Sequence, residues 1–512
     1  MFWLITIPSV LLLIILSIII YDLIQKDHAI LRNFPLVGHF RYILESIGPE
    51  LRQYIISQND EERPFTRDQR RWIYASAKKQ NNYFGFGTDN DIEHTSNYVI
   101  LKHSAFPYQK KTSTPKKENE LYSIPCAKIL GGARNRKKAF RPRSIISVSA
   151  MSYGSLGGAA VEALNHGCKL SECAHNTGEG GISIYHQKGG ELTLQIGTGY
   201  FGCRNDDGTF SMGKLVETVN NNPQVSSIEI KLSQGAKPGL GGLLPKKKIT
   251  QEISEARGIP RDQDCASPSS HSAFHDVDSM LDFVESIAEQ TGLPVGIKSA
   301  VGQLDFWHEL ATLMKDGKRG VDFIAIDGGE GGTGAAPLSF ADHVSLPFKL
   351  GFSKVYAIFA DAMLNEKIVF IGSAKLGFPM DALFAFGLGC DMISIAREAM
   401  LSIGCIQAQI CHTGHCPAGI ATHNKWLMRG LDPTLKAARF ANYAITLRSD
   451  LLKLCYATGV NHPALISTDY FEILDDQLGT TSFKETFGYQ HVNQSPSTED
   501  CAEIQRIMDD LN

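Results

Sequence analysis

The sequence predicts an α/β protein whose main body is one (β/α)8 barrel (a TIM barrel), preceded by a transmembrane helix and a juxtamembrane extension. Short runs of β-branched residues recur from about residue 140, each followed by a longer amphipathic stretch. The runs are apolar rather than alternating, which is typical of parallel strands covered on both faces. Eight such units over about 260 residues fit a closed barrel. A doubly wound open sheet is the alternative, but no G-x-G-x-x-G follows the first strand to favour it.

Length and composition set the class of the molecule. The chain has 512 residues, of which 43% are hydrophobic and 20% are charged. These values exclude a mostly disordered chain and a small disulfide-stapled module. The 50 Lys and Arg residues nearly balance the 54 Asp and Glu residues, giving a formal net charge of -4. Because nucleic-acid binders carry basic patches, we expect no nucleic-acid partner.

The first segment, residues 2–21, has no charged side chain and is nearly all apolar. As a helix it is long enough to cross the hydrocarbon core of a bilayer, so we predict a single-pass membrane anchor. No Lys or Arg precedes it, and Ser17–Tyr21 makes a poor cleavage site for a signal peptide. Lys26, Arg32 and Arg41 follow it, and the positive-inside rule then puts the catalytic body in the cytoplasm. A buried core helix and an unusual signal peptide are the alternatives.

The remaining elements follow in chain order. Residues 22–125 are polar and aromatic-spotted and form the expected juxtamembrane extension, with a charged loop near 110–120. Helices are predicted over 276–291 and 305–315, and residues 480–512 lack periodicity, which predicts a loose C-terminal tail. The eight predicted strands are 145–149, 174–176, 227–231, 264–266, 294–298, 323–327, 368–372 and 392–396.

Chemistry in such barrels sits where the strands end. The glycine-rich run 328–337 directly follows a predicted strand, and glycine lets a backbone approach a flat cofactor or a phosphate closely. A flexible linker is the alternative. Gly372–Ser373 and Ala396–Arg397 end the seventh and eighth strands, where barrels commonly hold a phosphate, although ordinary turns would look the same.

Two cations are candidates for binding an acidic substrate. Lys237 lies in a Gly/Pro-rich loop after the third predicted strand, and Arg257 follows about five helical turns later. A dicarboxylate needs two cations, and arginine can hold a carboxylate with two bonds. The alternative for Arg257 is a solvated helix residue.

Three cysteines form the pattern Cys405-x5-Cys411-x4-Cys416, with a proline after the last. This pattern can bind the iron of an iron–sulfur cluster. A zinc site that includes His412 or His415 is a competing interpretation, and free buried thiols are another. The chain has 11 cysteines, and an odd number scattered along a long chain favours reduced thiols or metal ligation over disulfides.

These motifs resemble one known family, the FMN-binding synthase domain of glutamate synthases. The resemblance covers about residues 130–460 and includes the cysteine spacing, which is that family's ligand pattern for a [3Fe–4S] cluster. The other motifs are 149–154 (SAMSYG), 176–181 (NTGEGG), 234–239 (QGAKPG) and 331–337 (GGTGAAP).

The resemblance implies a specific site. Electrons would enter through a cluster on Cys405, Cys411 and Cys416 and pass to FMN, which would deliver hydride to 2-iminoglutarate formed from 2-oxoglutarate and ammonia. Lys237 and Arg257 would bind the oxoacid, and Glu179 and Lys237 would be catalytic. FMN would lie against Ala150, Met151, Ser152, Gln234, Lys298, Gly331, Gly332, Thr333, Gly334, Gly372, Ser373 and Arg397.

The chain also departs from that family. Leu240 and Leu243 stand in a loop that often carries polar residues, one of which helps bind the oxoacid. Neither a glutaminase domain nor an NADPH-binding domain is visible, so we expect a stand-alone subunit. It would use free ammonia or another amine and an unidentified electron donor. The alternatives are an FMN-dependent transferase that moves an amine onto or from glutamate, and a membrane-tethered electron-transfer protein.

Overall fold

We describe the protein from a computed structural model, which covers residues 2–109, 120–244, 246, 249–261, 263–492 and 498–511. The chain divides into two compact units, Met1–Arg70 and Arg71–Asn512, which we treat separately.

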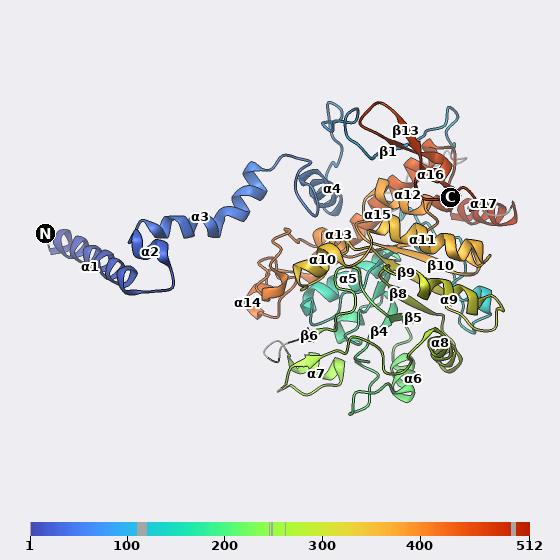
Figure 1. The fold of residues 1–512 in the computed structure, drawn as a ribbon, viewed down its shortest axis with the longest axis horizontal. Helices are drawn as coiled ribbons and strands as arrows, with labels where there is room; N and C mark the ends of the chain where they lie inside the picture. The colour runs from blue at the N-terminus through green and yellow to red at the C-terminus, as the bar shows by residue number, and fades with distance from the viewer. Residues whose placement is uncertain are drawn as a thin grey trace. The chain divides into compact units, whose positions relative to one another are not determined.

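The larger unit is built on a closed barrel of eight parallel strands, which confirms the predicted fold class (Figure 1). Each strand pairs with the next one around the barrel, and the last strand pairs with the first. The strands in order are β2 (Ile146–Val148), β3 (Ala174–Asn176), β4 (Glu191–Ile196), β5 (Val225–Lys231), β8 (Val295–Ser299), β9 (Phe323–Asp327), β10 (Val369–Ser373) and β11 (Met392–Ile395).

One predicted barrel strand was wrong and one real strand was missed. The run 264–266 forms only β7 (Cys265–Ala266), which pairs antiparallel with β6 (Leu243–Leu244) outside the barrel. The third barrel strand is instead β4, whose residues alternate between polar and apolar because polar side chains occupy the barrel interior. For example, the Thr193 and Ser227 hydroxyls lie 3.0 Å apart across β4 and β5. The loop that carries Lys237 therefore follows the fourth strand, not the third.

Helices pack outside the strands, and those predicted over 276–291 and 305–315 are present as α8 (Val277–Thr291) and α9 (Asp305–Met314). α5 (Gly158–Ser171) lies against the long helix α15 (Pro433–Ala457). The two can approach because Gly167 has no side chain; a Cβ there would lie 2.8 Å from the carbonyl oxygen of Ala437. The barrel helices are α5 (Gly158–Ser171), α6 (Met212–Asn221), α8 (Val277–Thr291), α9 (Asp305–Met314), α11 (Phe348–Asp361), α12 (Pro379–Gly387), α13 (Arg397–Ser402) and α15 (Pro433–Ala457). Shorter helices in the connecting loops are α7 (Gln251–Arg257), α10 (Leu338–His343) and α14 (Lys425–Met428).

Segments before and after the barrel join in a second small sheet. β1 (Tyr98–Leu101) pairs antiparallel with β12 (Phe471–Leu474), which also pairs with β13 (Thr480–Ser482). Within the expected extension over 22–125, residues from Arg71 onward thus belong to the same compact unit as the barrel.

The segment 480–512 differs from the loose tail expected of it. Its described part contains β13, α16 (Phe483–Thr486) and α17 (Thr498–Leu511). Phe483 and Tyr489 are fully buried, and the Tyr489 hydroxyl donates a 2.9 Å hydrogen bond to the carbonyl of Leu388. Large aromatic side chains hold the first part of this segment, and Ile504 and Met508, four residues apart in α17, are buried as well.

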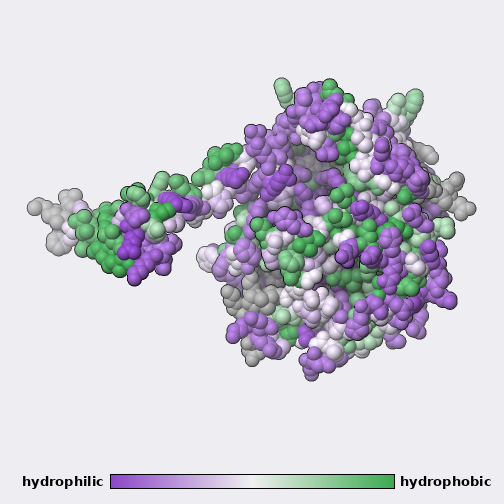
Figure 2. All heavy atoms as spheres, in the orientation of Figure 1, coloured by the Kyte–Doolittle hydropathy of each residue, from purple (hydrophilic) through white to green (hydrophobic). Residues whose placement is uncertain are grey.

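The smaller unit contains α1 (Phe2–Ile24), α2 (Ala29–Asn33), α3 (Gly38–Leu51) and a π-helical turn, η1 (Arg52–Ile56). Among the described residues, one helix is long and apolar enough to cross a membrane, over Thr6–Ile24 with a mean hydropathy of 2.6. Only 6% of that window is buried in the protein, and Figure 2 shows hydrophobic side chains gathered over it. The finding rests on length and composition alone, and a signal sequence has the same properties.

Candidate active site

A small polar pocket lies at the carboxyl ends of the barrel strands. Its walls come from the loops that follow β3, β4 and β5 and from the segment near Pro268. Three residues singled out from the sequence line it together, namely Glu179, Gln234 and Lys237. The sequence analysis missed a third charged member of this wall, Lys231, the last residue of β5.

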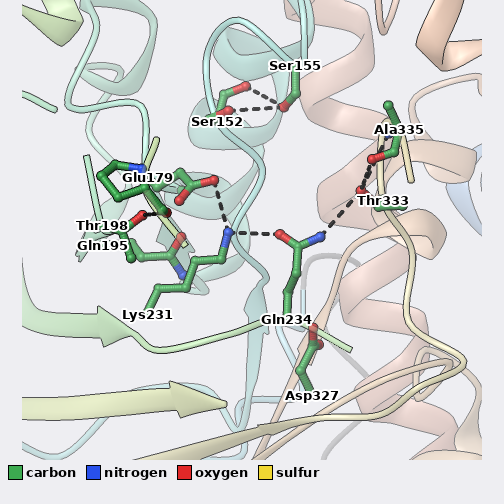
Figure 3. Close-up of polar contacts among 12 residues, drawn as sticks. Ser152, Ser155, Glu179, Gln195, Thr198, Lys231, Gln234, Asp327, Thr333 and Ala335 are labelled. Atoms are coloured by element: carbon green, nitrogen blue, oxygen red, sulfur yellow. Dashed lines mark hydrogen bonds and ion pairs between the residues drawn. The ribbon is translucent and has the colours of Figure 1, made fainter. Parts of the chain in front are cut away.

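Lys231 links the pocket residues in one chain of hydrogen bonds (Figure 3). Its Nζ donates to Glu179 Oε1 at 2.9 Å and to Gln234 Oε1 at 2.8 Å. The Gln234 amide then donates to the Thr333 hydroxyl at 3.3 Å. The loops after β3, β5 and β9 are thus joined, and the predicted residues Glu179, Gln234 and Thr333 belong to one network.

The charges around Glu179 keep it ionised. Burial alone raises the pKa of a carboxyl group, but the ammonium group of Lys231, with Lys237 and Arg257, lowers the pKa of Glu179 below its ordinary value. The pKa of Lys237 is also lowered, first by burial and then by repulsion from Lys231. The pocket therefore presents one carboxylate beside cations, an arrangement that can bind an acid and a positively charged nitrogen together.

Arg257 ends α7 and is buried, which excludes the solvated-residue alternative. Its guanidinium donates to the carbonyl of Tyr153 at 3.4 Å, lies 5.0 Å from the centroid of the Phe201 ring, and leaves its Nε without a partner. It is close enough to Glu179 to lower that group's pKa, but it is not part of the pocket wall.

A second polar group lies among the strand ends. The Lys298 ammonium is buried 3.5 Å from Asp327 Oδ1 and 3.4 Å from the Ser149 hydroxyl. The Ser149 hydroxyl lies 3.3 Å from that of Ser373, another predicted residue. Asp327 Oδ2 accepts from the backbone N–H of Gly235 at 2.8 Å, which fixes the loop that carries Gln234. Asp327 is the second residue whose role the sequence analysis missed.

The glycine run after β9 packs against Arg397, the first residue of α13. A Cβ on Gly332 would lie 2.7 Å from Arg397 Cδ, so only glycine fits there without displacement. The Arg397 guanidinium donates to the carbonyl of Glu330 at 2.5 Å. Gly331 donates to the carbonyl of Gly328 at 2.8 Å, and Gly334 has open space where its Cβ would be.

The other predicted contacts occupy strand ends nearby. Met151 is buried and Ala150 is half-buried directly after β2, and the Ser152 hydroxyl donates to that of Ser155 at 3.2 Å. Gly372 is buried and pairs with Ile326 across β10 and β9.

The three cysteines of the proposed cluster do not form a ligand set in this structure. Across the described residues, no group of three or more His, Cys, Asp or Glu side chains is arranged to hold a metal ion. Cys411 and Cys416 do interact, since the pKa of the Cys411 thiol is raised by burial and by Cys416. None of the 11 cysteines, all of which lie in the described ranges, is part of a disulfide in this structure.

The loop that departs from the family pattern also reaches the pocket. Leu240 lines it and is 39% exposed, which puts an apolar surface beside the charged residues. The Leu243 side chain lies outside the described part of the structure.

A closed parallel barrel with a charged pocket at the carboxyl ends of its strands defines a barrel enzyme. The family model described as the conserved region in glutamate synthase matches residues 92–461, and the chain belongs to this family. It is accordingly an oxidoreductase of the glutamate synthase-like class.

Curated relatives agree with this membership. The chain is 37% identical to the glutamate synthase large subunit-like protein YerD of Bacillus subtilis, over 88% of this chain and 91% of that protein. It is 33% identical to the archaeal glutamate synthase (NADPH) of Methanocaldococcus jannaschii, over 62% of this chain and 59% of that protein. The chain thus spans less than two thirds of the archaeal relative. A mandelate oxidase variant solved with a monooxide FMN adduct aligns with a TM-score of 0.39 at 13% identity, covering 77% of this chain and 93% of that one, and we draw nothing from it.

Proposed function

We propose that this enzyme reduces 2-iminoglutarate, formed from 2-oxoglutarate and ammonia, to L-glutamate with FMN as its cofactor. The observation that carries the proposal is the convergence of Glu179, Lys231, Gln234 and Lys237 on one pocket at the strand ends. Family membership supports the reaction class.

The residues at the strand ends suit a flavin mononucleotide. The backbone of the 331–334 run can approach a flat ring closely. Gln234 lies beside this run, because its amide donates a hydrogen bond to the Thr333 hydroxyl. Lys298 is a buried lysine at the strand ends, and Arg397 lies against the glycine run, so both could offer positive charge to a phosphate held after β10 and β11. When bound, FMN supplies the hydride chemistry.

The pocket residues have separate tasks toward the substrate. Lys237 and Lys231 orient a dicarboxylate by its charges, and Arg257 adds to the positive potential. Glu179 stays ionised and accepts a hydrogen bond from the N–H of the iminium group, which holds the reacting carbon in place. The overall reaction takes 2-oxoglutarate, ammonia, two electrons and two protons to glutamate and water.

We further propose that Cys405, Cys411 and Cys416 hold a [3Fe–4S] cluster. The support is their spacing within one short segment and the proximity of Cys411 to Cys416. Because the arrangement described above is not a ligand set, we assign no step to a cluster.

Leu240 favours a second candidate, in which another amine replaces ammonia. An apolar wall in the pocket of Glu179 would favour an alkyl group on the substrate nitrogen, because that group would be removed from water on binding. In that case the enzyme would be an FMN-dependent transferase or would form an N-substituted glutamate.

We also propose that α1 anchors the protein in a membrane with the catalytic unit in the cytoplasm. The support is the length and hydropathy of Thr6–Ile24 and the basic residues that follow it. An electron donor of unknown identity would then be needed on the same side.

An anaerobic titration tests the main proposal. The reduced holoenzyme is mixed with 2-oxoglutarate and ammonia, and flavin reoxidation and glutamate are followed together. We expect both in equal amounts, and we expect Lys237→Met to abolish them while Lys188→Met leaves them unchanged. Reoxidation with methylamine but not with ammonia would favour the second candidate. No response to either amine in flavin-loaded protein would contradict both.

A further inference from the structure

α3, the second helix after the proposed anchor, carries an apolar face that is exposed within the smaller unit. We call it the α3 face. Its members recur at spacings of three and four residues, so they lie on one side of the helix. Phe40 is 63% exposed and Ile43 is 55% exposed. The α3 face comprises Phe40, Ile43, Leu44, Ile47 and Leu51, and it continues in η1 with Tyr54 and Ile55.

The opposite side of α3 is polar and carries no net charge. Arg41 and Glu45 form an exposed ion pair at 2.8 Å one turn apart. Glu50 near the end of α3 and Arg52 at the start of η1 add one charge of each sign. An apolar side opposite a neutral polar side is typical of a helix that lies at a boundary between water and an apolar phase.

The start of α3 is tied to the end of α1. Asp22, near the end of α1, is fully buried, and its Oδ2 accepts from the backbone N–H of Leu36 at 2.9 Å. Its Oδ1 lies 2.9 Å from His39 Nε2, in the first turn of α3. From this point α3 leads away from α1 instead of folding back along it (Figure 1). The polar end of α1 and the first turn of α3 are therefore held side by side.

We propose that α3 lies on the membrane surface with the α3 face in the boundary between head groups and acyl chains. The inference rests on the proposed anchor, because α1 in a bilayer puts Asp22 at the surface and brings the first turn of α3 there with it. The apolar side chains of the α3 face then lie at the boundary where α1 leaves the bilayer. Because the polar side is neutral, burial of apolar side chains provides the attraction, and binding does not require anionic lipid.

Tryptophan quenching in vesicles tests this placement with the full chain. Ile47→Trp adds a reporter on the α3 face, and Ser46→Trp adds a matched reporter on the adjacent polar side, where the residue is also exposed. Both proteins are reconstituted in phosphatidylcholine vesicles containing brominated acyl chains, and the signal of the unmodified chain is subtracted. Circular dichroism confirms that each variant keeps its helices.

We expect quenching at position 47 to exceed that at position 46 by about twofold or more, and to be stronger with bromines near the head group than with bromines near the bilayer centre. Replacing part of the lipid by phosphatidylglycerol should leave this difference unchanged. If the chain floats with the vesicles but both positions are quenched equally, the placement of α3 is wrong while the anchor stands. Protection of position 47 that grows with protein-to-lipid ratio would assign the face to a second copy and overturn the inference. If the chain does not float with vesicles, the anchor itself fails.

Discussion

Replacing Lys231 by Met should weaken the pocket in a way that depends on pH. Lys231 donates to Glu179 at 2.9 Å and to Gln234 at 2.8 Å, and the side chains of the ion pair are 14% and 23% exposed. Removing one member of a hydrogen-bonded pair this buried costs about 1.5–3 kcal/mol. The free energy of unfolding at neutral pH should fall by that amount, and the dissociation constant of 2-oxoglutarate should rise by roughly 10- to 150-fold.

The pH dependence gives the sharper test. In the unmodified protein the pKa of Glu179 is lowered, so the ion pair adds stability above the ordinary pKa of a glutamate, and this contribution is lost as the pH falls through the lowered value. In Lys231→Met the ammonium group that offsets the burial of Glu179 is gone, so the pKa of Glu179 should rise. The stability difference between the two proteins should therefore be largest at neutral pH and shrink in acid.

Urea unfolding of the full chain in detergent at several pH values measures this difference. Lys188→Met is the matched control, since Lys188 Nζ lies 3.3 Å from Glu162 with side chains that are 38% and 30% exposed. That variant should lose under about 1 kcal/mol. Equal losses in both variants, or a Lys231→Met difference that grows in acid, would refute the reasoning.

Three further predictions concern the cofactor, acid stability and the metal. Gly332→Ala should lower the flavin bound per chain severalfold because the added Cβ meets Arg397, whereas Gly334→Ala, with open space around it, should not; flavin released on denaturation measures both. Burial lowers the pKa of His462 to about 4, so as the pH falls the unfolded chain takes up a proton before the folded one does. The free energy of unfolding should therefore fall by up to about 3 kcal/mol between pH 6.5 and 4. His462→Gln should make the free energy of unfolding depend less on pH in this range, and an unchanged dependence would contradict the assignment. Cys411→Ser should abolish iron binding, while Cys455→Ser, at a buried cysteine in α15, should retain it; iron analysis of protein prepared without oxygen decides, and equal iron in both would exclude a cluster at this segment.

The barrel could be predicted because most of its strands are buried on both faces. Phe323–Asp327 and Val295–Ser299 are buried along their whole length, and runs that are apolar up to a polar last residue or two mark such strands in the sequence. β4 was missed because Thr193 and Gln195 point into a polar barrel interior, where Gln195 donates to Glu229 at 2.6 Å. An alternating strand in that setting resembles an exposed segment, and no local signal corrects the error.

The pocket was predictable where glycine and charge coincide in loops, as at Glu179 and Lys237. Lys231 and Asp327 were missed because each is the last residue of its strand, β5 or β9, and a charged residue also marks an ordinary strand end. Their roles depend on contacts between different loops, such as the bond from Gly235 to Asp327, and these follow only from the barrel's closure. The cysteine spacing is a local signal, but side-chain directions within the segment are not encoded by spacing.

The segment before the barrel also braces distant parts of the catalytic unit. In α4 (Arg67–Ala77), the Tyr74 hydroxyl donates to the carbonyl of Cys405 at 2.6 Å, and the Asn442 amide donates to the carbonyl of Ala77 at 3.1 Å. β1 meanwhile supplies the partner of β12. A shortened protein that began at the first barrel strand would lose these contacts to the cysteine loop and would leave β12 without its partner β1. Any shortened version for crystallisation should therefore retain the whole of α4 and β1.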